Sequence, residues 1–258
     1  MDFTLNFHKD DSEYICNYIK TNGCWEPCTT EILVELFKQK KDDTVFIDVG
    51  ANIGYFSIIA ACNNVPVLAF EPIDANYSLL MTAVAQNKYE KLVLGFKMAL
   101  SSKQDEVTFN VSKSNMGLCG IDSLPDELHS YTEKCNTETL DKFFGISAMN
   151  DIIIKIDVGS TWYDVLLGME ETMKSGRVSH VVIEVPKYDS NLFTYFRKYG
   201  LDKCINVGFS DRQYVDCNTS YLKTSKYICS IDSIEQDFLS NQSSPMIILF
   251  YKGLTIEA

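Results

Sequence analysis

The sequence lacks the long apolar run that a membrane-spanning helix needs. No stretch of about 18 consecutive apolar residues occurs among its 258 residues, so we expect no membrane span and no membrane partner. The first residues, MDFTLNFHKDD, lack the basic start and apolar core of a secretory signal. Internal repeats and low-complexity linkers are also missing, which favours one domain over residues 1–258. These absences predict a cytoplasmic protein.

Positive charge is scarce. The chain has 23 lysines and arginines against 35 acidic residues, and its formal net charge is −12. Proteins that bind nucleic acid present a basic surface to the phosphate backbone, so this balance argues against a nucleic-acid partner. The densest basic run contains Lys38, Lys40 and Lys41, and we interpret it as a solvated helix end.

Cysteines are scattered without the spacing of a disulfide framework. Nine are present, an odd number, and we expect reduced thiols in a cytosolic compartment. Cys24 and Cys28 have loose metal-like spacing, but no second pair or nearby histidine completes a zinc site. The cysteines therefore predict no bound metal.

Apolar runs of strand length alternate with helical segments along most of the chain. Continuous apolar strands between helices are typical of a parallel sheet covered on both faces. We predict strands over 44–49, 65–70, 92–98, 106–111, 152–158, 180–185, 203–208 and 246–252. We predict helices over 53–62, 75–87, 137–144, 162–174 and 190–199, and a helical lid or outer layer over 1–42. No helix of usual length separates the last two strands, which suits an antiparallel finish to the sheet.

The stretch TVFIDVGANIGYFSIIAA, residues 44–61, joins a buried strand to a helix through a tight turn. Gly50 permits a tight turn with a close backbone approach, and Asn52 is among the few non-glycine residues that tolerate a left-handed conformation. Gly54 lets the helix approach the strand. Ligands of open α/β sheets bind beyond the carboxyl ends of the strands, so we expect a ligand at this turn.

The turn does not complete the common nucleotide-binding motifs. A dinucleotide motif placed on Gly50 needs glycine at 52 and glycine or alanine at 55, where Asn52 and Tyr55 stand. A P-loop is excluded because no Gly-Lys-Ser/Thr follows. The next predicted strand ends at Glu71, whose carboxylate can accept both hydroxyls of a ribose. Asp48 near the end of the first strand, the glycine turn that follows it and Glu71 together fit a nucleoside ligand without a pyrophosphate, such as S-adenosylmethionine.

Several segments resemble the FkbM-type S-adenosylmethionine-dependent methyltransferases, in the order and spacing of that family. They are FIDVGANIGYFSIIAA, AFEPIDANYSLLMTAVAQN, MALSS, TETLDKFF and IIIKIDV, with GCWEP similar to the family's N-terminal segment. The resemblance covers roughly residues 20–190. It implies an α/β, Rossmann-like class I methyltransferase fold, with a seven-stranded, mostly parallel sheet, helices on both faces and an antiparallel last-but-one strand. It also implies methyl transfer to a hydroxyl, often on a sugar or small natural product.

The same resemblance implies a set of residues that bind S-adenosylmethionine: Glu26, Asp48, Gly50, Asn52, Gly54, Glu71, Ala99 and Leu100. The residues of the turn and Asp48 would line the methionine end. Glu71 would hold the ribose, and residues 99–100 would flank the adenine. Glu26 would close the site from the N-terminal segment.

The chain departs from the family after IKIDV. The family continues with EGAE, whereas this chain has GSTW, so Gly159 and Trp162 replace two glutamates at the mouth of the site. One interpretation is a changed acceptor that stacks on Trp162; another is that Trp162 only packs its helix. A third is a catalytically degenerate relative that binds cofactor or a partner. Asp157 alone supplies too few oxygen ligands for a divalent ion, so we predict no metal.

Methyl transfer to a neutral hydroxyl needs a base or a metal ion. Asp157 ends the fourth main strand and is the leading candidate for the base, although it could instead cap the following helix or hold the cofactor. Lys155, two residues earlier, shares its face of the strand. His129, in a polar loop, and Lys187, after the fifth strand, are the other catalytic candidates, and Glu184 faces the same mouth.

An aspartate after strand four and a lysine after strand five are also similar to RNA cap ribose 2′-O-methyltransferases. Asp157 and Lys187 would be joined by a lysine from 38 to 41 and a late glutamate such as Glu235. The acidic net charge argues against this alternative. The sequence therefore predicts an O-methyltransferase acting on a small or sugar-like acceptor. If the protein is active, we expect open space between Asp157 and the turn at residues 50–54, whereas an inactive relative would fill that space with Trp162, Tyr55 or Tyr163.

Overall fold

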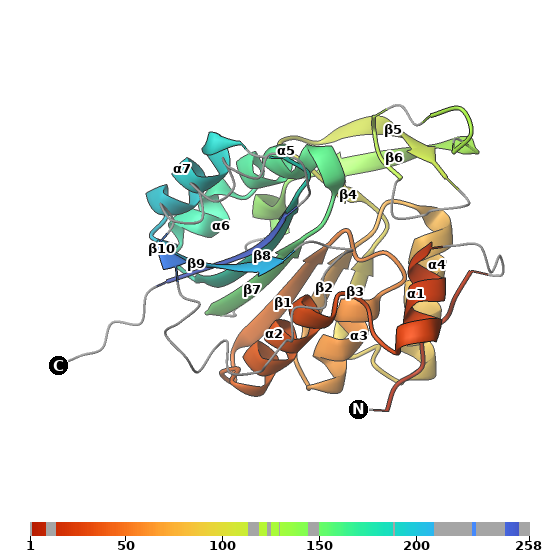
Figure 1. Ribbon diagram of the computed structural model, residues 1–258, viewed down its shortest axis with the longest axis horizontal. Helices are drawn as coiled ribbons and strands as arrows, with labels where there is room; N and C mark the ends of the chain where they lie inside the picture. Colours follow the sequence, from red (N-terminus) through yellow and green to blue (C-terminus); the bar gives the residue numbers. More distant parts are fainter. Residues whose placement is uncertain are drawn as a thin grey trace.

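The computed structural model describes residues 2–8, 14–112, 119–122, 125–128, 130–143, 150–187, 189–208, 229–230 and 246–252. Within these ranges the chain forms one large, mostly parallel sheet covered by helices on both faces, with a smaller sheet beside it (Figure 1). This is the α/β, Rossmann-like architecture that the sequence predicted. No helix in the described ranges is long and apolar enough to cross a membrane.

The large sheet has the strand order β10-β9-β11-β8-β7-β1-β2-β3. The bounds are β1 Thr44–Val49, β2 Val67–Phe70, β3 Val93–Phe96, β7 Asp151–Ile156, β8 Val178–Val185, β9 Lys203–Gly208, β10 Cys229–Ser230 and β11 Met246–Tyr251. Strand β1 pairs in parallel with β2 and β7, whereas β11 lies antiparallel between β8 and β9. Apart from the two-residue edge strand β10, this is the predicted seven-stranded, mostly parallel sheet with an antiparallel last-but-one strand.

Successive side chains of the central strands point to opposite faces of the sheet, and each face has its own hydrophobic core. In β1, Val45 and Ile47 belong to one core and Phe46 to the other. Helices α5 (Trp162–Leu167), α6 (Glu170–Lys174) and α7 (Ser190–Lys198) cover the first face. The second face is covered by α1 (Tyr14–Asn22), α2 (Pro27–Lys38), α3 (Tyr55–Cys62) and α4 (Asp74–Gln86). The predicted N-terminal helices therefore belong to this second layer.

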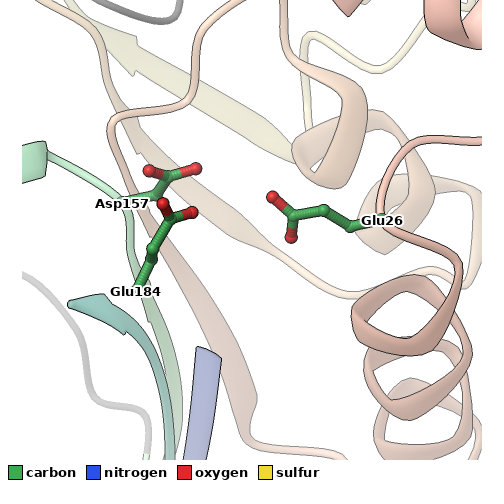
Figure 2. Close-up of side chains that lie close together, drawn as sticks. All are labelled: Glu26, Asp157 and Glu184. Carbon is green, nitrogen blue, oxygen red and sulfur yellow. The ribbon is translucent and has the colours of Figure 1, made fainter. Parts of the chain in front are cut away.

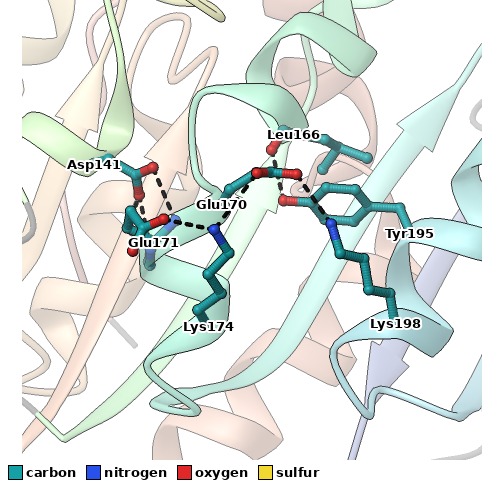
Figure 3. A network of polar contacts seen from close by, with 8 residues as sticks. Asp141, Leu166, Glu170, Glu171, Lys174, Tyr195 and Lys198 are labelled. Atoms are coloured by element: carbon teal, nitrogen blue, oxygen red, sulfur yellow. Dashed lines mark hydrogen bonds and ion pairs between the residues drawn. The ribbon is translucent and has the colours of Figure 1, made fainter.

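The predicted helix over 162–174 is two short helices. A side chain at Gly168, between α5 and α6, would place its Cβ 1.9 Å from the carbonyl oxygen of Ser101, so a close backbone contact falls at the break. Across this face, Asp141 accepts hydrogen bonds from the backbone N–H groups of Glu171 and Thr172 at 2.9 and 2.7 Å (Figure 3). These bonds satisfy N-terminal amides of α6 from outside the helix.

The side chains of α7 complete the connection between these helices. The Tyr195 hydroxyl donates to the carbonyl of Leu166 at 2.5 Å, and Lys198 pairs with Glu170 at 3.2 Å (Figure 3). Helix α7 is thereby bonded to both α5 and α6. This layer holds the segment that follows β7, where the candidate site begins.

A second, three-stranded sheet was not predicted. Strand β6 (Tyr131–Glu138) pairs in parallel with β4 (Ala99–Leu100) and antiparallel with β5 (Asp105–Val111). The helix predicted over 137–144 is therefore wrong at its start, because Thr137 and Glu138 end β6, and only the 3-10 turn η2 (Leu140–Phe143) follows. The polar sequence of β6 gave little apolar signal, since one face is exposed. Figure 1 shows β5 and β6 beyond one end of the large sheet.

The expectation of reduced thiols holds only in part. Six cysteines are free thiols in the described residues, but Cys28 is disulfide-bonded, so the expectation is wrong there. Spacing along the sequence misses such a bond, because pairing depends on the distance between Cα atoms in the fold.

Candidate functional site

A cavity of about 370 Å³ opens at the carboxyl ends of β1, β2 and β7. Its walls come from the turn at residues 49–53, from residues 70–73 after β2, and from residues 157–161 after β7. Residues 25–26 close it from the N-terminal segment, and residues 99–100 and 119–122 close it from the small sheet. This is the position at which open α/β sheets bind ligands.

The turn after β1 has the predicted left-handed conformations. Gly50 has φ +83° and Asn52 has φ +50°. A Cβ at Gly50 would lie 2.0 Å from the carbonyl oxygen of Asp157, so glycine there lets the ends of β1 and β7 meet. The Asn52 N–H donates to Glu71 Oε2 at 2.8 Å, which joins the turn to the end of β2.

Glu71 is a buried carboxyl in the cavity wall. Its Oε1 accepts a hydrogen bond from the Ile73 N–H at 2.9 Å, and its Oε2 accepts the bond from Asn52. Burial raises the pKa of Glu71 to about 7, although these N–H donors oppose the rise. The Asn76 side-chain amide also donates to Oε1, at 3.4 Å, so the second lone pair that Glu71 keeps for a ligand hydroxyl is on Oε2.

Two residues of the predicted cofactor-binding set do not line the cavity. Asp48 is buried beneath the turn, where its Oδ2 accepts a hydrogen bond from Ser57 Oγ at 2.6 Å. A Cβ at Gly54 would lie 2.3 Å from Leu80 Cδ1, so this glycine serves the packing of α3 against α4. The structure gives both residues scaffold contacts, and the other six line the cavity.

Lys155 and Asp157 share one side of β7, as their spacing predicted. Lys155 Nζ donates to Asp157 Oδ2 at 2.8 Å and lies 4.7 Å from the centroid of the Phe56 ring. Burial lowers the pKa of Lys155, but the carboxylates of Asp157, Glu26 and Asp48 outweigh it and hold this pKa above its ordinary value. The lysine is therefore a fixed positive charge beneath Asp157, whose side chain is 32% exposed.

Glu26 reaches the same place from the segment before α2. It is buried, with 5% of its surface exposed, and its backbone is left-handed with φ +40°. Burial raises the pKa of Glu26 to about 7, with Lys155 opposing and Asp157 adding to the rise. Its side chain does not cap α2 but extends toward Asp157 and Glu184 (Figure 2).

Glu184 completes a group of three carboxylates. Ile156 of β7 pairs with Ile183 of β8. Asp157 and Glu184 are the residues that directly follow this pair, so they lie side by side at the same end of the sheet. One carboxylate oxygen from each of Glu26, Asp157 and Glu184 lies within 4.8 Å of the other two (Figure 2). The expectation of no metal assumed that Asp157 lacks acidic neighbours. That premise is wrong, because the neighbours come from distant parts of the sequence.

Trp162 packs its helix and does not line the cavity. It is buried in the core beneath α5, with its ring centroid 5.4 Å from that of Tyr163. The interpretation of Trp162 as a platform for the acceptor is therefore wrong. Gly159 lines the cavity with φ +61°, and a Cβ there would meet no atom within 4 Å. Of the three aromatic residues with which an inactive relative would fill the space beside Asp157, Trp162 and Tyr163 do not line the cavity, but Tyr55 does. Activity therefore stays a prediction.

The remaining catalytic candidates are not brought to the cavity. Lys187 is exposed and does not line it. His129 and Glu235 lie outside the described residues. Lys41 pairs at 3.5 Å with Asp151, which begins β7 and so lies at the opposite edge of the sheet from Asp157. Lys41, one of the lysines from 38 to 41 in the RNA cap alternative, therefore lies at the opposite end of β7 from Asp157.

Sequence reasoning missed the contribution of the small sheet to the cavity. Phe109 of β5 lines it, together with Cys119, Ile121 and Asp122. The Ser160 hydroxyl donates a hydrogen bond to the Asp122 carboxylate, which links this wall to the segment after β7. No motif marks these residues, because Phe109 reaches the cavity through the pairing of β5 with β6, and residues 119–122 reach it through a bridge between Gly120 and Asn110 of β5.

Comparisons with known proteins give one sequence relative and a set of distant structural ones. No family model matches the chain. The AMB antimetabolite synthetase AmbE of Pseudomonas aeruginosa is 28% identical over a region that covers 55% of this chain and 8% of that protein. The chain thus spans less than a tenth of the length of the curated relative it matches.

Three solved structures illustrate the structural similarity. A SAM-dependent methyltransferase from Agrobacterium tumefaciens has a TM-score of 0.47 and 8% identity, covering 88% of this chain and 62% of that one. Human methyltransferase 10 domain containing protein has a TM-score of 0.47 and 12% identity, covering 97% and 89%. The METTL16 MTase domain has a TM-score of 0.45 and 12% identity, covering 97% and 74%. These scores carry no functional argument. The chain is distantly similar in shape to methyltransferases, and its fold is assigned from its own strand order.

Proposed function

We propose that this protein is an S-adenosylmethionine-dependent methyltransferase that acts on a hydroxyl of a small or sugar-like acceptor. The observation that carries the proposal is the cavity at the carboxyl ends of β1, β2 and β7. It joins the turn at residues 50–53, with its left-handed Gly50 and Asn52, to the buried Glu71 and the partly exposed Asp157. The resemblance to FkbM-type methyltransferases supports the same reading.

The chemistry of the cavity wall fits this cofactor. The turn offers small side chains and backbone amides to the methionine end, and Glu71 keeps a lone pair on Oε2 for a ribose hydroxyl. Ala99 and Leu100, at the start of the small sheet, offer an apolar wall for the adenine. When bound, the cofactor supplies a methyl group that moves from sulfur to the acceptor oxygen, leaving S-adenosylhomocysteine and a methyl ether.

Asp157 would take the proton that the acceptor hydroxyl loses. Lys155 holds its Oδ2, so the carboxylate is fixed in direction and its other oxygen can accept the proton. A base within hydrogen-bond reach contributes about a hundred- to ten-thousandfold to the rate. The rest of the rate enhancement would come from holding the acceptor in line with the methyl group.

Calorimetry with S-adenosylhomocysteine tests the cofactor site. Glu71→Ala removes the acceptor for the ribose hydroxyls, and charged hydrogen bonds contribute about 1.5–3 kcal/mol, so affinity should fall about tenfold or more. Glu90→Ala, at an exposed glutamate outside the cavity, is the matched control and should bind normally. Absence of any measurable binding by the intact protein would contradict the proposal. Unchanged affinity in Glu71→Ala would remove only the role of Glu71.

An acceptor screen tests the chemistry. Asp157→Asn keeps the shape of the side chain but accepts a proton poorly, so turnover should fall about a hundred- to ten-thousandfold with little change in cofactor affinity. Full turnover in that variant would refute the role of Asp157. Tight cofactor binding without methylation of any hydroxyl compound would favour the catalytically degenerate alternative. A capped RNA included in the same screen tests the other alternative, an RNA cap ribose 2′-O-methyltransferase, by its methylation.

A further inference from the structure

Three carboxylates that are distant in sequence converge at the inner wall of the cavity. Glu26 precedes α2, Asp157 follows β7, and Glu184 lies near the end of β8 (Figure 2). One oxygen of each lies within 4.8 Å of the others. Carboxylate oxygens are the ligands that Mg²⁺, Mn²⁺ and Ca²⁺ prefer.

Glu26 gives an independent sign that a ligand belongs here. Its Oε2 is buried and accepts no hydrogen bond in the described part of the chain. A buried polar atom without a partner costs about 1–3 kcal/mol, and more when it is charged. Its left-handed backbone, directly before Pro27, adds strain of the kind found at ligand sites. Both costs are offset if a cation binds the carboxylate.

Lys155 does not remove the need for such a cation. Its ammonium donates to Asp157 Oδ2 and acts electrostatically on the carboxylates of Glu26 and Asp48 as well. One lysine thus serves three acids. The other oxygen of Asp157 stays available on the cavity side, since Asp157 lines the cavity.

We propose that Glu26, Asp157 and Glu184 bind one hard divalent cation. Oxygens on opposite sides of Mg²⁺ lie about 4.2 Å apart, and those around Ca²⁺ about 4.6–5.2 Å apart. The observed limit of 4.8 Å therefore suits Ca²⁺ with little movement, and Mg²⁺ or Mn²⁺ after small side-chain rotations. The cavity leaves room for water or another oxygen to complete the coordination.

The cation site shares Asp157 with the proposed methyl transfer, but it can be tested separately. Its three ligands are present whether or not the protein binds S-adenosylmethionine. A role for the cation in orienting an acceptor hydroxyl beside Asp157 does rest on the proposed function. The binding experiment therefore uses no cofactor.

Mn²⁺ binding to the full chain, followed by electron paramagnetic resonance of the free ion, tests the proposal. We expect one saturable site with a dissociation constant of about a millimolar or tighter, and competition by Ca²⁺ and Mg²⁺. Glu184→Gln, at a half-buried position, and Glu26→Gln should each weaken binding at least about tenfold. Because the chain carries 35 acidic residues, Glu90→Gln controls for non-specific binding and should behave as the parent protein.

The outcomes separate the two proposals. No saturable Mn²⁺ binding, or equal binding by the parent protein, Glu184→Gln and Glu26→Gln, would overturn the cation site. Circular dichroism of each variant checks that the variant is folded, so that a loss of Mn²⁺ binding is not a loss of folding. If Glu26→Gln fails to fold, Glu184→Gln alone tests the cation site. Calorimetry with S-adenosylhomocysteine in a chelator reports the cofactor site by itself, so either site can fail while the other stands.

Discussion

Gly50 and Gly159 form a matched pair for measuring the close contact between β1 and β7. Both have left-handed backbones, with φ +83° and +61°, and both line the cavity. They differ in what an added Cβ would meet. At Gly50 the carbonyl oxygen of Asp157 lies only 2.0 Å away, whereas at Gly159 no atom lies within 4 Å.

The expected costs follow from this difference. An alanine in the left-handed region costs about 1–2 kcal/mol, so Gly159→Ala should lower the free energy of unfolding by about that amount. Gly50→Ala carries the same cost and must also move the backbone at Asp157 by roughly 1 Å or more. That movement weakens the bond from the Asp157 N–H to the Val49 carbonyl, now 3.0 Å long. We expect a total of about 4 kcal/mol or more.

Urea unfolding followed by circular dichroism measures both variants on one scale. A difference of about 2–3 kcal/mol corresponds to roughly 4–12 °C in melting temperature for a domain of this size. The parent protein and both variants should share one m-value, which shows that the unfolding transition is comparable. Equal free energies of unfolding for Gly50→Ala and Gly159→Ala would refute the reasoning, because the close contacts of an added Cβ with Asp157 and Val158 exist only at Gly50.

Two further predictions concern the core and the buried acids. Trp162→Glu places a carboxylate in the core beneath α5, so we expect a loss of at least about 3 kcal/mol in urea unfolding; a parent-like melting temperature would contradict the packing described. The free energy of unfolding should fall as pH rises from about 4.5 to about 7, because the pKa values of Glu26 and Glu71 are raised to about 7. In that interval the folded state keeps protons that the unfolded state has lost, with an upper limit of about 3 kcal/mol per group. Glu71→Gln should flatten this dependence, and an unchanged slope would show that Glu71 is already ionised at low pH.

Local signals were sufficient for the central strands and the first turn. The bounds of β1 and β9 agree with the prediction to the residue, because each is a short apolar run that ends in glycine or a polar turn. The left-handed backbone of Asn52 followed from its residue type between two glycines. Glu71 reached the cavity because adjacent parallel strands end at the same edge of a sheet.

Contacts between distant segments could not be read from the sequence. The meeting of Glu26 with Asp157 and Glu184 depends on the packing of the N-terminal segment against the sheet. Asp48 and Gly54 match a motif by position, but the motif does not say which residues face the ligand and which hold the scaffold. Strand β6 was missed because its polar, half-exposed sequence has no apolar run, and its partner strands decide its conformation.

The position of β11 has a consequence for how the chain acquires its fold during synthesis. A ribosome releases β8 and β9 well before residues 246–251, yet β11 is the strand that joins them. Until it arrives, β8 and β9 each have an unpaired edge in the interior of the future sheet. Such edges are templates for pairing with other nascent chains. The parallel centre formed by β7, β1, β2 and β3 can assemble on the ribosome, whereas the other half of the sheet must wait for the last strand.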